Sequence, residues 1–215
     1  MDQTQTFTEL RQDMVDRQLR PRGINDERVL NAMRSVPRHL FVPDSIRHRA
    51  YEDRALPLID DQTISQPWIV AMIAQSLALG PSDIVLDVGA GSGYQAAVLA
   101  ACCDRVVAVE IRESLAQRAA LNLQTAGVEN VKLVVANGRD GAPSDAPFDA
   151  IAVAAATSTL SSVWFNQLVE GGRLVVPLGT PSVQELMLYR KTDHLDGGRS
   201  LCRCIFVPLV DRLRP

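Results

Sequence analysis

An apolar run that leads directly into a glycine-rich turn is the feature that most constrains the fold of this chain. Residues 84–88 read Ile-Val-Leu-Asp-Val, and Gly89, Gly91 and Gly93 follow at intervals of two. A nearly continuous apolar run of this length is typical of a central strand in a parallel sheet. Glycines allow φ angles and close backbone approaches that a Cβ forbids. The pattern predicts a buried strand, a nucleotide-cofactor turn and a helix that begins near Tyr94.

The spacing of these glycines narrows the choice of cofactor. A dinucleotide turn reads G-x-G-x-x-G, whereas here the third glycine comes one residue early, and no Gly-Lys-Ser/Thr follows to hold phosphates. The segment 87–93 instead resembles the (D/E)-x-G-x-G-x-G turn of class I S-adenosylmethionine-dependent methyltransferases. An acidic Asp87 suits the cationic methionyl end of that cofactor. The alternative, a turn that only closes a strand-to-helix corner, remains open at this point.

A second feature lies one strand further along. The apolar run 105–109 ends in Glu110, whose carboxylate can accept hydrogen bonds from both hydroxyls of a ribose. The resemblance therefore implies S-adenosylmethionine as cofactor and S-adenosylhomocysteine as product. The residues expected to bind it are Asp87, Gly89, Ala90, Gly91, Ser92, Gly93, Glu110, Ile111, Asn137 and Gly138.

The rest of the chain predicts helices first and then alternating strands and helices. Helical spacing covers 7–18, 26–33 with Asn25 or Asp26 as N-cap, and 67–77, which Gly80-Pro81 should stop. Strands are expected at 84–88, 106–109, 131–135, 148–154 and 173–177, with helices from 94, at 114–125 and at 163–168. The last strands, 185–189 and 203–209, should form an antiparallel pair at the sheet edge. We therefore expect an α/β fold: a doubly wound, Rossmann-like methyltransferase sheet, mostly parallel, preceded by N-terminal helices.

Length and composition set looser limits. A chain of 215 residues predicts one domain, with a helical and acceptor-loop region over 1–80 and a cofactor-binding core over 81–215. The net charge is −3, no uncharged run reaches membrane-spanning length, and the N-terminus is polar. These features predict a cytoplasmic protein that binds neither nucleic acid nor membranes, and we expect a monomer. The cysteines, Cys102-Cys103 and Cys202-x-Cys204, lack zinc-site spacing, so we expect reduced thiols and no metal.

A longer series of motifs resembles one family of methyltransferases. Its segments follow in the order found in protein-L-isoaspartate O-methyltransferases and cover nearly the whole chain: Arg22-Gly23-Ile24, Val36-Pro37-Arg38, Phe41-Val42-Pro43, Ala50-Tyr51-Glu52-Asp53, Leu56-Pro57, Gln62-Thr63-Ile64-Ser65-Gln66-Pro67, Pro147-Phe148-Asp149-Ala150-Ile151, Gly171 to Pro177 and Phe206-Val207-Pro208-Leu209. The Thr-Ile-Ser-Gln-Pro segment is the diagnostic one, because it stands immediately before the methyltransferase sheet.

The resemblance implies a particular reaction. Enzymes of this family methylate the free α-carboxylate of isoaspartyl residues in damaged proteins, so peptides and proteins that carry this lesion are the expected partners. The family places its active-site serine at Ser65, and the expected acceptor-binding residues are Gln62, Thr63, Ile64, Ser65 and Gln66. A carboxylate is already ionised at neutral pH, so the site needs alignment more than a strong base. We accordingly interpret His39, His48 and His194 as structural or surface residues.

Three positions depart from the family pattern. Asn137 stands where the family has an aspartate that contacts the adenine amine, Asp60-Asp61 replace part of a glycine-rich segment, and Thr157-Ser158 replace two prolines. Two alternatives to isoaspartyl repair therefore stay open. The chain could be a divergent paralogue that methylates another carboxylate, or a cofactor-binding protein with little turnover. Transfer to a base or amide nitrogen is disfavoured, because the loop 154–158 reads Ala-Ala-Ala-Thr-Ser and lacks an Asn/Asp-Pro-Pro-Tyr-like cluster.

Overall fold

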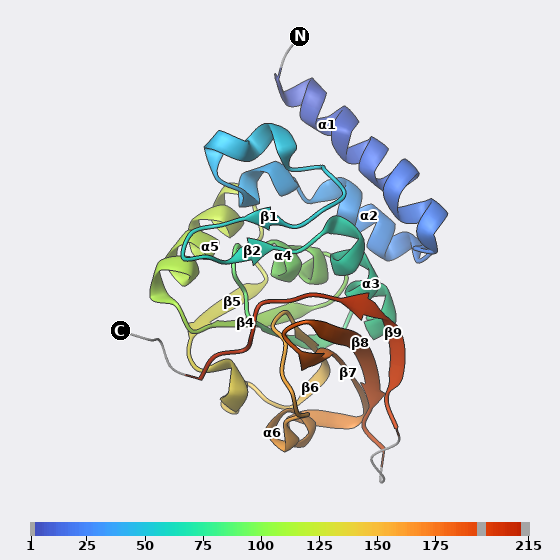
Figure 1. The fold of residues 1–215 in the computed structure, drawn as a ribbon, viewed down its shortest axis with the longest axis vertical. Coiled ribbons are helices and arrows are strands. Elements are labelled where there is room, and N and C mark those ends of the chain that lie inside the picture. The colour runs from blue at the N-terminus through green and yellow to red at the C-terminus, as the bar shows by residue number, and fades with distance from the viewer. Residues whose placement is uncertain (1–2, 193–196, 212–215) are drawn as a thin grey trace.

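A seven-stranded sheet forms the centre of the computed structural model, which describes residues 3–192 and 197–211 (Figure 1). The strand order is β5-β4-β3-β6-β7-β8-β9; the first five strands run parallel, and β8 is antiparallel to both of its neighbours. This confirms the predicted fold class. The strands are β3 Ile84–Val88, β4 Arg105–Glu110, β5 Val131–Val135, β6 Phe148–Val153, β7 Leu168–Thr180, β8 Val183–Arg190 and β9 Arg199–Cys204.

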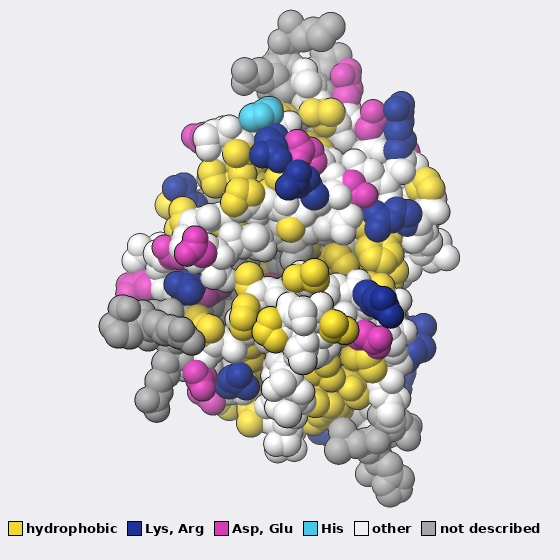
Figure 2. All heavy atoms as spheres, viewed as in Figure 1, with side chains coloured by type: hydrophobic (Ala, Val, Ile, Leu, Met, Phe, Trp, Pro, Cys, Tyr) yellow, Lys and Arg dark blue, Asp and Glu magenta, His cyan; other side chains and the backbone are white. Residues whose placement is uncertain are grey.

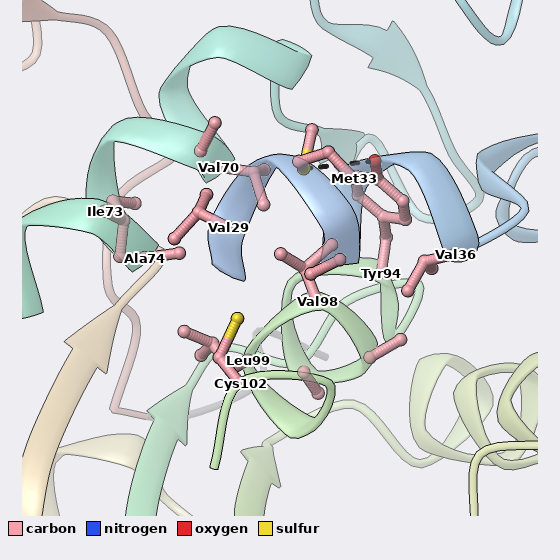
Figure 3. Packing of buried hydrophobic residues seen from close by; sticks show 14 of the residues in the cluster. Val29, Met33, Val36, Val70, Ile73, Ala74, Tyr94, Val98, Leu99 and Cys102 are labelled. Carbon is pink, nitrogen blue, oxygen red and sulfur yellow. Dashed lines mark hydrogen bonds between the residues drawn. The ribbon is translucent and has the colours of Figure 1, made fainter. Parts of the chain in front are cut away.

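Alternation along the central strands divides the core into two layers. Successive strand residues point to opposite faces, so Val85 and Ala150 belong to one hydrophobic cluster while Leu86 and Ile151 belong to the other. The first layer is covered by α2 Glu27–Ser35, α3 Pro67–Leu77, α4 Tyr94–Ala100 and α5 Glu113–Thr125, and the second by the short α6 Ser162–Asn166. Figure 3 shows α2, α3 and α4 meeting through apolar side chains: Val29 and Met33, Val70 and Ile73, and Val98 and Leu99.

The N-terminal helices are longer and less regular than predicted. Helix α1, Gln3–Asp13, continues into a π-helical turn, Met14–Leu19, and a 3₁₀ turn that Gly23 ends with a φ of 88°. Helix α2 begins where predicted, because the Asp26 carboxylate accepts hydrogen bonds from the amides of Arg28 and Val29. Two 3₁₀ helices, Arg38–Phe41 and Asp44–Arg49, follow it.

Helix α3 covers the predicted range 67–77, and it stops before the Gly80-Pro81 pair is reached. Its last residue is Leu77, and Ala78 takes a left-handed φ of 46°. Arg173 explains this stop, since its Nε donates to the carbonyl of Leu77 at 2.8 Å and its guanidinium also bonds Asp83. A cation at a helix C-terminus satisfies carbonyls that have no partner within the helix. The sequence pattern does not reveal this contact, because Arg173 lies 96 residues away from Leu77.

The C-terminal edge is antiparallel as predicted, but three element bounds were wrong. The last strand is Arg199–Cys204 and not 203–209, β7 extends well beyond 173–177, and α6 ends before Leu168, which belongs to β7. After Cys204 the chain leaves the sheet and pairs with the loop that follows β6, where the amide of Ala156 donates to Val207 at 2.8 Å. Pro208 has no backbone N–H, so it cannot donate a hydrogen bond to a neighbouring strand as the predicted strand 203–209 would require. Among the described residues, no helix has the length and apolar character needed to cross a membrane.

Candidate active site

A cleft opens at the carboxyl ends of the parallel strands, where ligands bind in folds of this kind. The hairpin of β1, Leu56–Pro57, and β2, Thr63–Ile64, lies between the N-terminal helices and these strand ends (Figure 1). The cleft is open to solvent, and its space, counted together with that open solvent, is about 790 Å³. It brings together these predicted site residues: Gln62, Thr63, Ile64, Ser65, Gly89, Ala90, Gly91, Ser92, Glu110, Ile111 and Gly138.

The glycine turn forms the floor of this cleft. Gly89, Gly91 and Gly93 have φ values of 89°, 54° and 87°, so all three adopt the left-handed region. The amides of Gly89 and Ala90 both donate to the carbonyl of Val109, which fastens the turn to β4. A Cβ added to Gly91 would have only the Gly89 carbonyl within 4 Å, at 3.9 Å, whereas one at Gly93 would meet Leu123 at 3.2 Å. Gly91 therefore faces open space, while Gly93 packs against α5.

Glu110 connects the turn to the end of β4. Its two carboxylate oxygens accept hydrogen bonds from the amides of Gly91, at 2.9 Å, and Arg112, at 3.0 Å. The side chain is buried and still lines the cleft. Each carboxylate oxygen has a second lone pair, so the anchored group retains the capacity to accept hydrogen bonds from a ligand. The backbone thus holds this carboxylate in one orientation toward the cleft.

Asp87 lies fully buried below the turn, outside the lining of the cleft. Its Oδ1 accepts a hydrogen bond from Gln95 at 2.7 Å, whereas its Oδ2 and the Gln95 Oε1 are buried without a partner. Burial, opposed by the Gln95 bond and assisted by the negative charge of Glu110, raises the pKa of Asp87 to about 7. Buried polar atoms without partners are unusual in native structures. The Asp87 Oδ2 and Gln95 Oε1 atoms can therefore still accept hydrogen bonds, and the ionised form of Asp87 would attract a cationic ligand.

Gly138 and Asn137 follow β5 at the edge of the cleft. Gly138 lines it, and an added Cβ would lie 2.7 Å from Val88, so only glycine fits. Asn137 is outside the lining; its Oδ1 accepts a hydrogen bond from the amide of Arg139 at 3.0 Å and caps a short 3₁₀ helix. An amide oxygen has two lone pairs, so this cap leaves one available for the role predicted for Asn137.

Ser65 lines the same cleft as the glycine turn and comes from the hairpin segment. It immediately follows β2, is half-buried and lines the cleft together with Gly89 and Ala154. Its carbonyl accepts a hydrogen bond from the guanidinium of Arg38 at 2.8 Å. The glycine turn and the predicted catalytic serine therefore line one cavity.

A surface groove meets the cleft at Ser65. Its lining includes Gln66, the one predicted acceptor residue that is absent from the cleft, together with Trp68 and the segment 203–207. Thr63, Ser65, Ala154 and Val207 line both cavities. A ligand in the groove and a ligand in the cleft would therefore meet next to the serine.

The three departures from the family pattern lie outside the cleft lining. Asp60 and Asp61 form the hairpin turn with φ values of 57° and 54°, and the Asp60 carboxylate bonds the Ser114 hydroxyl on α5. Thr157 is buried, and its amide donates to the carbonyl of Pro177 on β7 at 3.1 Å. Neither carboxylate of the acidic pair therefore belongs to the cleft lining, and that of Asp60 is directed toward α5.

The described histidines and the four cysteines lie outside the lining of the cleft. His39 stacks on Phe7 with 4.2 Å between ring centroids, and its pKa falls to about 4 because of burial and the nearby charges of Arg11 and Arg47. His194 lies outside the described residues. All four cysteines are free, and burial raises their pKa. The described residues contain no group of three His, Cys, Asp or Glu side chains that could hold a metal ion.

The sequence did not identify several lining residues. Tyr94, Gln95 and Leu115 come from α4 and α5, and Arg112 stands between Glu110 and α5. The C-terminal segment 207–210 closes one side, although it was predicted to be part of a strand. The Phe206-Val207-Pro208-Leu209 motif was the sequence signal that could have identified this segment as part of the site. Together, the sheet, the turn and the anchored Glu110 define the class of protein: a Rossmann-like methyltransferase that binds S-adenosylmethionine.

Comparison with known proteins identifies the family. The family model described as "Protein-L-isoaspartate(D-aspartate) O-methyltransferase (PCMT)" matches residues 9–214. The protein-L-isoaspartate O-methyltransferase of Herpetosiphon aurantiacus is 46% identical over 93% of this chain and 89% of its own length. Protein-L-isoaspartate O-methyltransferase 1 of Syntrophobacter fumaroxidans is 51% identical over 85% of each chain. This chain therefore belongs to the protein-L-isoaspartate O-methyltransferase family, whose members depend on S-adenosylmethionine.

Solved structures agree with this assignment. A protein-L-isoaspartate O-methyltransferase superimposes with a TM-score of 0.84 at 31% identity, covering 92% of this chain; this chain spans 65% of that one. A putative protein-L-isoaspartate O-methyltransferase from Plasmodium falciparum, in complex with S-adenosyl-L-homocysteine, has a TM-score of 0.78 at 24% identity and covers 94% of this chain and 98% of its own. At 24% identity, the similarity to the Plasmodium falciparum protein supports the fold alone.

Proposed function

We propose that this enzyme transfers a methyl group from S-adenosylmethionine to the free α-carboxylate of L-isoaspartyl residues in peptides and proteins. One observation carries the proposal: Ser65 lines both the cofactor cleft and the surface groove. An acceptor that is part of a polypeptide needs an open groove that leads to the cofactor. Membership of the family supports this choice of acceptor over another carboxylate.

The cofactor half of the reaction is assigned to the glycine turn and the strand ends around it. The residues present fit the cofactor, because Gly91 faces open space, Glu110 presents an anchored carboxylate, and buried acceptors on Asp87 and Gln95 have no partner. In this proposal Glu110 accepts from the ribose, while Asp87 attracts the cationic methionyl end. The cofactor, when bound, supplies an electrophilic methyl group on a sulfonium.

The acceptor half is assigned to the loop that follows β2. The Ser65 hydroxyl donates to the incoming carboxylate, and Gln62, Thr63, Ile64 and Gln66 form the surrounding wall. The carboxylate needs no general base, since its pKa of about 4 leaves it ionised at neutral pH. The protein's task is to hold the nucleophilic oxygen in line and close to the methyl group. Attraction between carboxylate and sulfonium favours the encounter.

We also propose that the enzyme works in the cytoplasm as a monomer, without nucleic acid or membrane. Four free thiols suit a reducing compartment. Figure 2 shows basic and acidic side chains interspersed over the visible face, which differs from the continuous basic surface that nucleic acid favours. Exposed large hydrophobic side chains such as Leu10, Leu121 and Val183 come from separate elements.

Paired peptides test the proposal. The enzyme is incubated with methyl-labelled S-adenosylmethionine and two peptides that differ only in an aspartyl or isoaspartyl linkage. We expect base-labile methyl ester on the isoaspartyl peptide alone. Equal labelling of both peptides would indicate another carboxylate acceptor. Absence of transfer, with cofactor binding intact by calorimetry, would refute the reaction.

A further inference from the structure

A fully buried arginine lies behind the acceptor loop. Arg38 begins the 3₁₀ helix after α2, and none of its surface is exposed. Its Nε donates to the carbonyl of Ala50 at 2.7 Å and its second terminal nitrogen to the carbonyl of Ser65 at 2.8 Å. The other terminal nitrogen is buried without a partner. No carboxylate in the described part of the chain forms an ion pair with this guanidinium.

A buried guanidinium without a carboxylate partner lowers the stability of the fold. Burying a charge without a paired opposite charge disfavours folding by several kcal/mol, and an apolar side chain of similar volume is often better for stability. Desolvation also lowers the pKa of this guanidinium. The energetics therefore favour a role for Arg38 beyond filling space.

The contact with Ser65 fixes the orientation of one peptide plane. The bond between Ser65 and Gln66 is trans, since the only cis peptide among the described residues is Ala146-Pro147. A trans peptide directs its carbonyl and its N–H to opposite sides. Arg38 holds the carbonyl toward itself, so the Gln66 amide points away from Arg38; Ser65 and Gln66 both line the groove. Within the described residues this amide has no hydrogen-bond acceptor.

Arg38 also contacts the cofactor side of the cleft. The centre of its guanidinium lies 4.7 Å from the ring centroid of Tyr94. Tyr94 begins α4 directly after the glycine turn, is buried and lines the cleft. A guanidinium over an aromatic face gains a cation–π attraction that strengthens when water is absent. One side chain thus joins the acceptor loop to the helix that carries the cofactor turn.

We propose that Arg38 is a positioning residue for the acceptor: by fixing the Ser65–Gln66 peptide against Tyr94, it directs the Gln66 amide at the carboxylate of the substrate. The inference rests on the proposed function for the identity of that carboxylate. If the peptide rotated, a carbonyl oxygen would face the carboxylate in place of an N–H. Repulsion would then weaken peptide binding, while the cofactor cradle would remain.

Two substitutions test the role of Arg38. Arg38→Met removes the charge and the donors at similar length, and Arg38→Lys keeps the charge but loses the fork that reaches two carbonyls at once. Arg17→Met, at a side chain that is 78% exposed, serves as the control. Each protein is measured for KM and kcat with an isoaspartyl peptide, for S-adenosylhomocysteine affinity by calorimetry, and for amide hydrogen exchange.

We expect Arg38→Met to raise the peptide KM at least tenfold, with kcat and cofactor affinity within about threefold of wild type. Arg38→Lys should fall between Arg38→Met and wild type. Amides of residues 62–64, in the β1–β2 hairpin, should exchange faster, with β3 unchanged. An unchanged KM in a folded variant would overturn the inference, as would a loss of cofactor affinity as large as the rise in KM. If Arg38→Met does not fold, Arg38→Lys is decisive on the same criteria.

The design also separates this inference from the proposed function. If wild-type enzyme fails to methylate the isoaspartyl peptide, the proposed function fails on that observation alone. The exchange comparison still decides whether Arg38 holds the acceptor loop. Faster exchange confined to residues 62–64 supports the positioning role, and unchanged exchange there contradicts it.

Discussion

The two sides of the cleft are built in different ways. On the cofactor side, the turn 89–93 is held by hydrogen bonds to Val109 and Glu110, at the end of the neighbouring strand. On the acceptor side, Ser65 follows a two-residue strand, and its carbonyl is held by Arg38, 27 residues earlier in the chain. The first side depends on backbone conformation, and the second depends on one buried side chain.

The difference affects how each side responds to substitution. The cofactor side requires residues without a Cβ at particular positions, so a change there should be severe and specific. The acceptor side distributes its support over a hairpin, a helix and Arg38, so single changes should alter binding or rate by smaller factors.

Gly91→Val should abolish cofactor binding, with a decrease in affinity of more than about 100-fold. The new side chain would fill the open space in front of the turn, since it has almost no protein neighbours. Calorimetry with S-adenosylhomocysteine measures this effect. Gly127→Val is the matched control, because Gly127 also has a positive φ, 69°, and a Cβ added there would meet no atom within 4 Å. Equal affinities in the two variants would show that backbone strain, and not cofactor contact, is responsible.

Asp87→Asn should weaken cofactor binding by about 30-fold at pH 8, which corresponds to about 2 kcal/mol for loss of a charged partner. The raised pKa of Asp87, about 7, adds a pH dependence. Below pH 7 the carboxyl is protonated and neutral, so wild-type affinity should rise about tenfold between pH 6 and pH 8. The variant should lack this rise. A similar pH dependence in both proteins would exclude Asp87 as its source.

The same substitution should stabilise the cofactor-free protein. The folded-state pKa of Asp87 is raised from its ordinary 3.8 to about 7, so the fold favours the protonated form. That contribution is present in acid and is lost as the pH rises through 7, where a buried charge remains. At pH 8 we expect Asp87→Asn to gain roughly 1–4 kcal/mol in the free energy of unfolding. The gain should shrink toward pH 4, and a pH-independent difference would argue for packing instead.

Ser65→Ala should lower turnover by about tenfold and leave cofactor affinity nearly unchanged. The hydroxyl is assigned to the acceptor carboxylate, and one lost hydrogen bond to a charged group is worth about 1.5 kcal/mol. Steady-state kinetics and calorimetry provide the two readouts. Ser200→Ala, an exposed position on β9, controls for loss of a serine hydroxyl elsewhere. Reduced cofactor affinity with normal turnover would place Ser65 on the wrong side of the cleft.

Asp61→Gly should have the smallest effect. Its φ of 54° is strained for a residue with a Cβ. Glycine relieves this strain but has greater conformational entropy in the unfolded state, so the free energy of unfolding should rise by up to about 0.5 kcal/mol. Turnover should stay within about twofold, because this carboxylate does not line the cleft. Asp104 does not have a positive φ, so Asp104→Gly should instead lower the free energy of unfolding by about 0.5 kcal/mol. Chemical denaturation measures both, and a loss of stability in each would contradict the strain assignment.

The contrast also explains what the sequence could predict. The turn, β3 and Glu110 were predictable, because spacing within a short segment determines them. The acceptor loop was accessible through its resemblance to a family motif. Arg38 belonged to the Val36-Pro37-Arg38 motif, but its contacts with Ser65 and Tyr94 depend on packing between distant elements. The predicted bounds of the last strand were wrong for the same reason, because the chain after Cys204 pairs with Ala156 in a distant loop.

A structure of the enzyme with S-adenosylhomocysteine and an isoaspartyl peptide tests the central claim most directly. We predict that the sulfur lies above Gly89 and Gly91 and that the peptide follows the groove beside Trp68. Its α-carboxylate should contact Ser65 and the Gln66 amide, with an oxygen close enough that a methyl group on the sulfur would lie about 3–3.5 Å away. A peptide bound elsewhere, or a carboxylate directed away from the sulfur, would contradict this account.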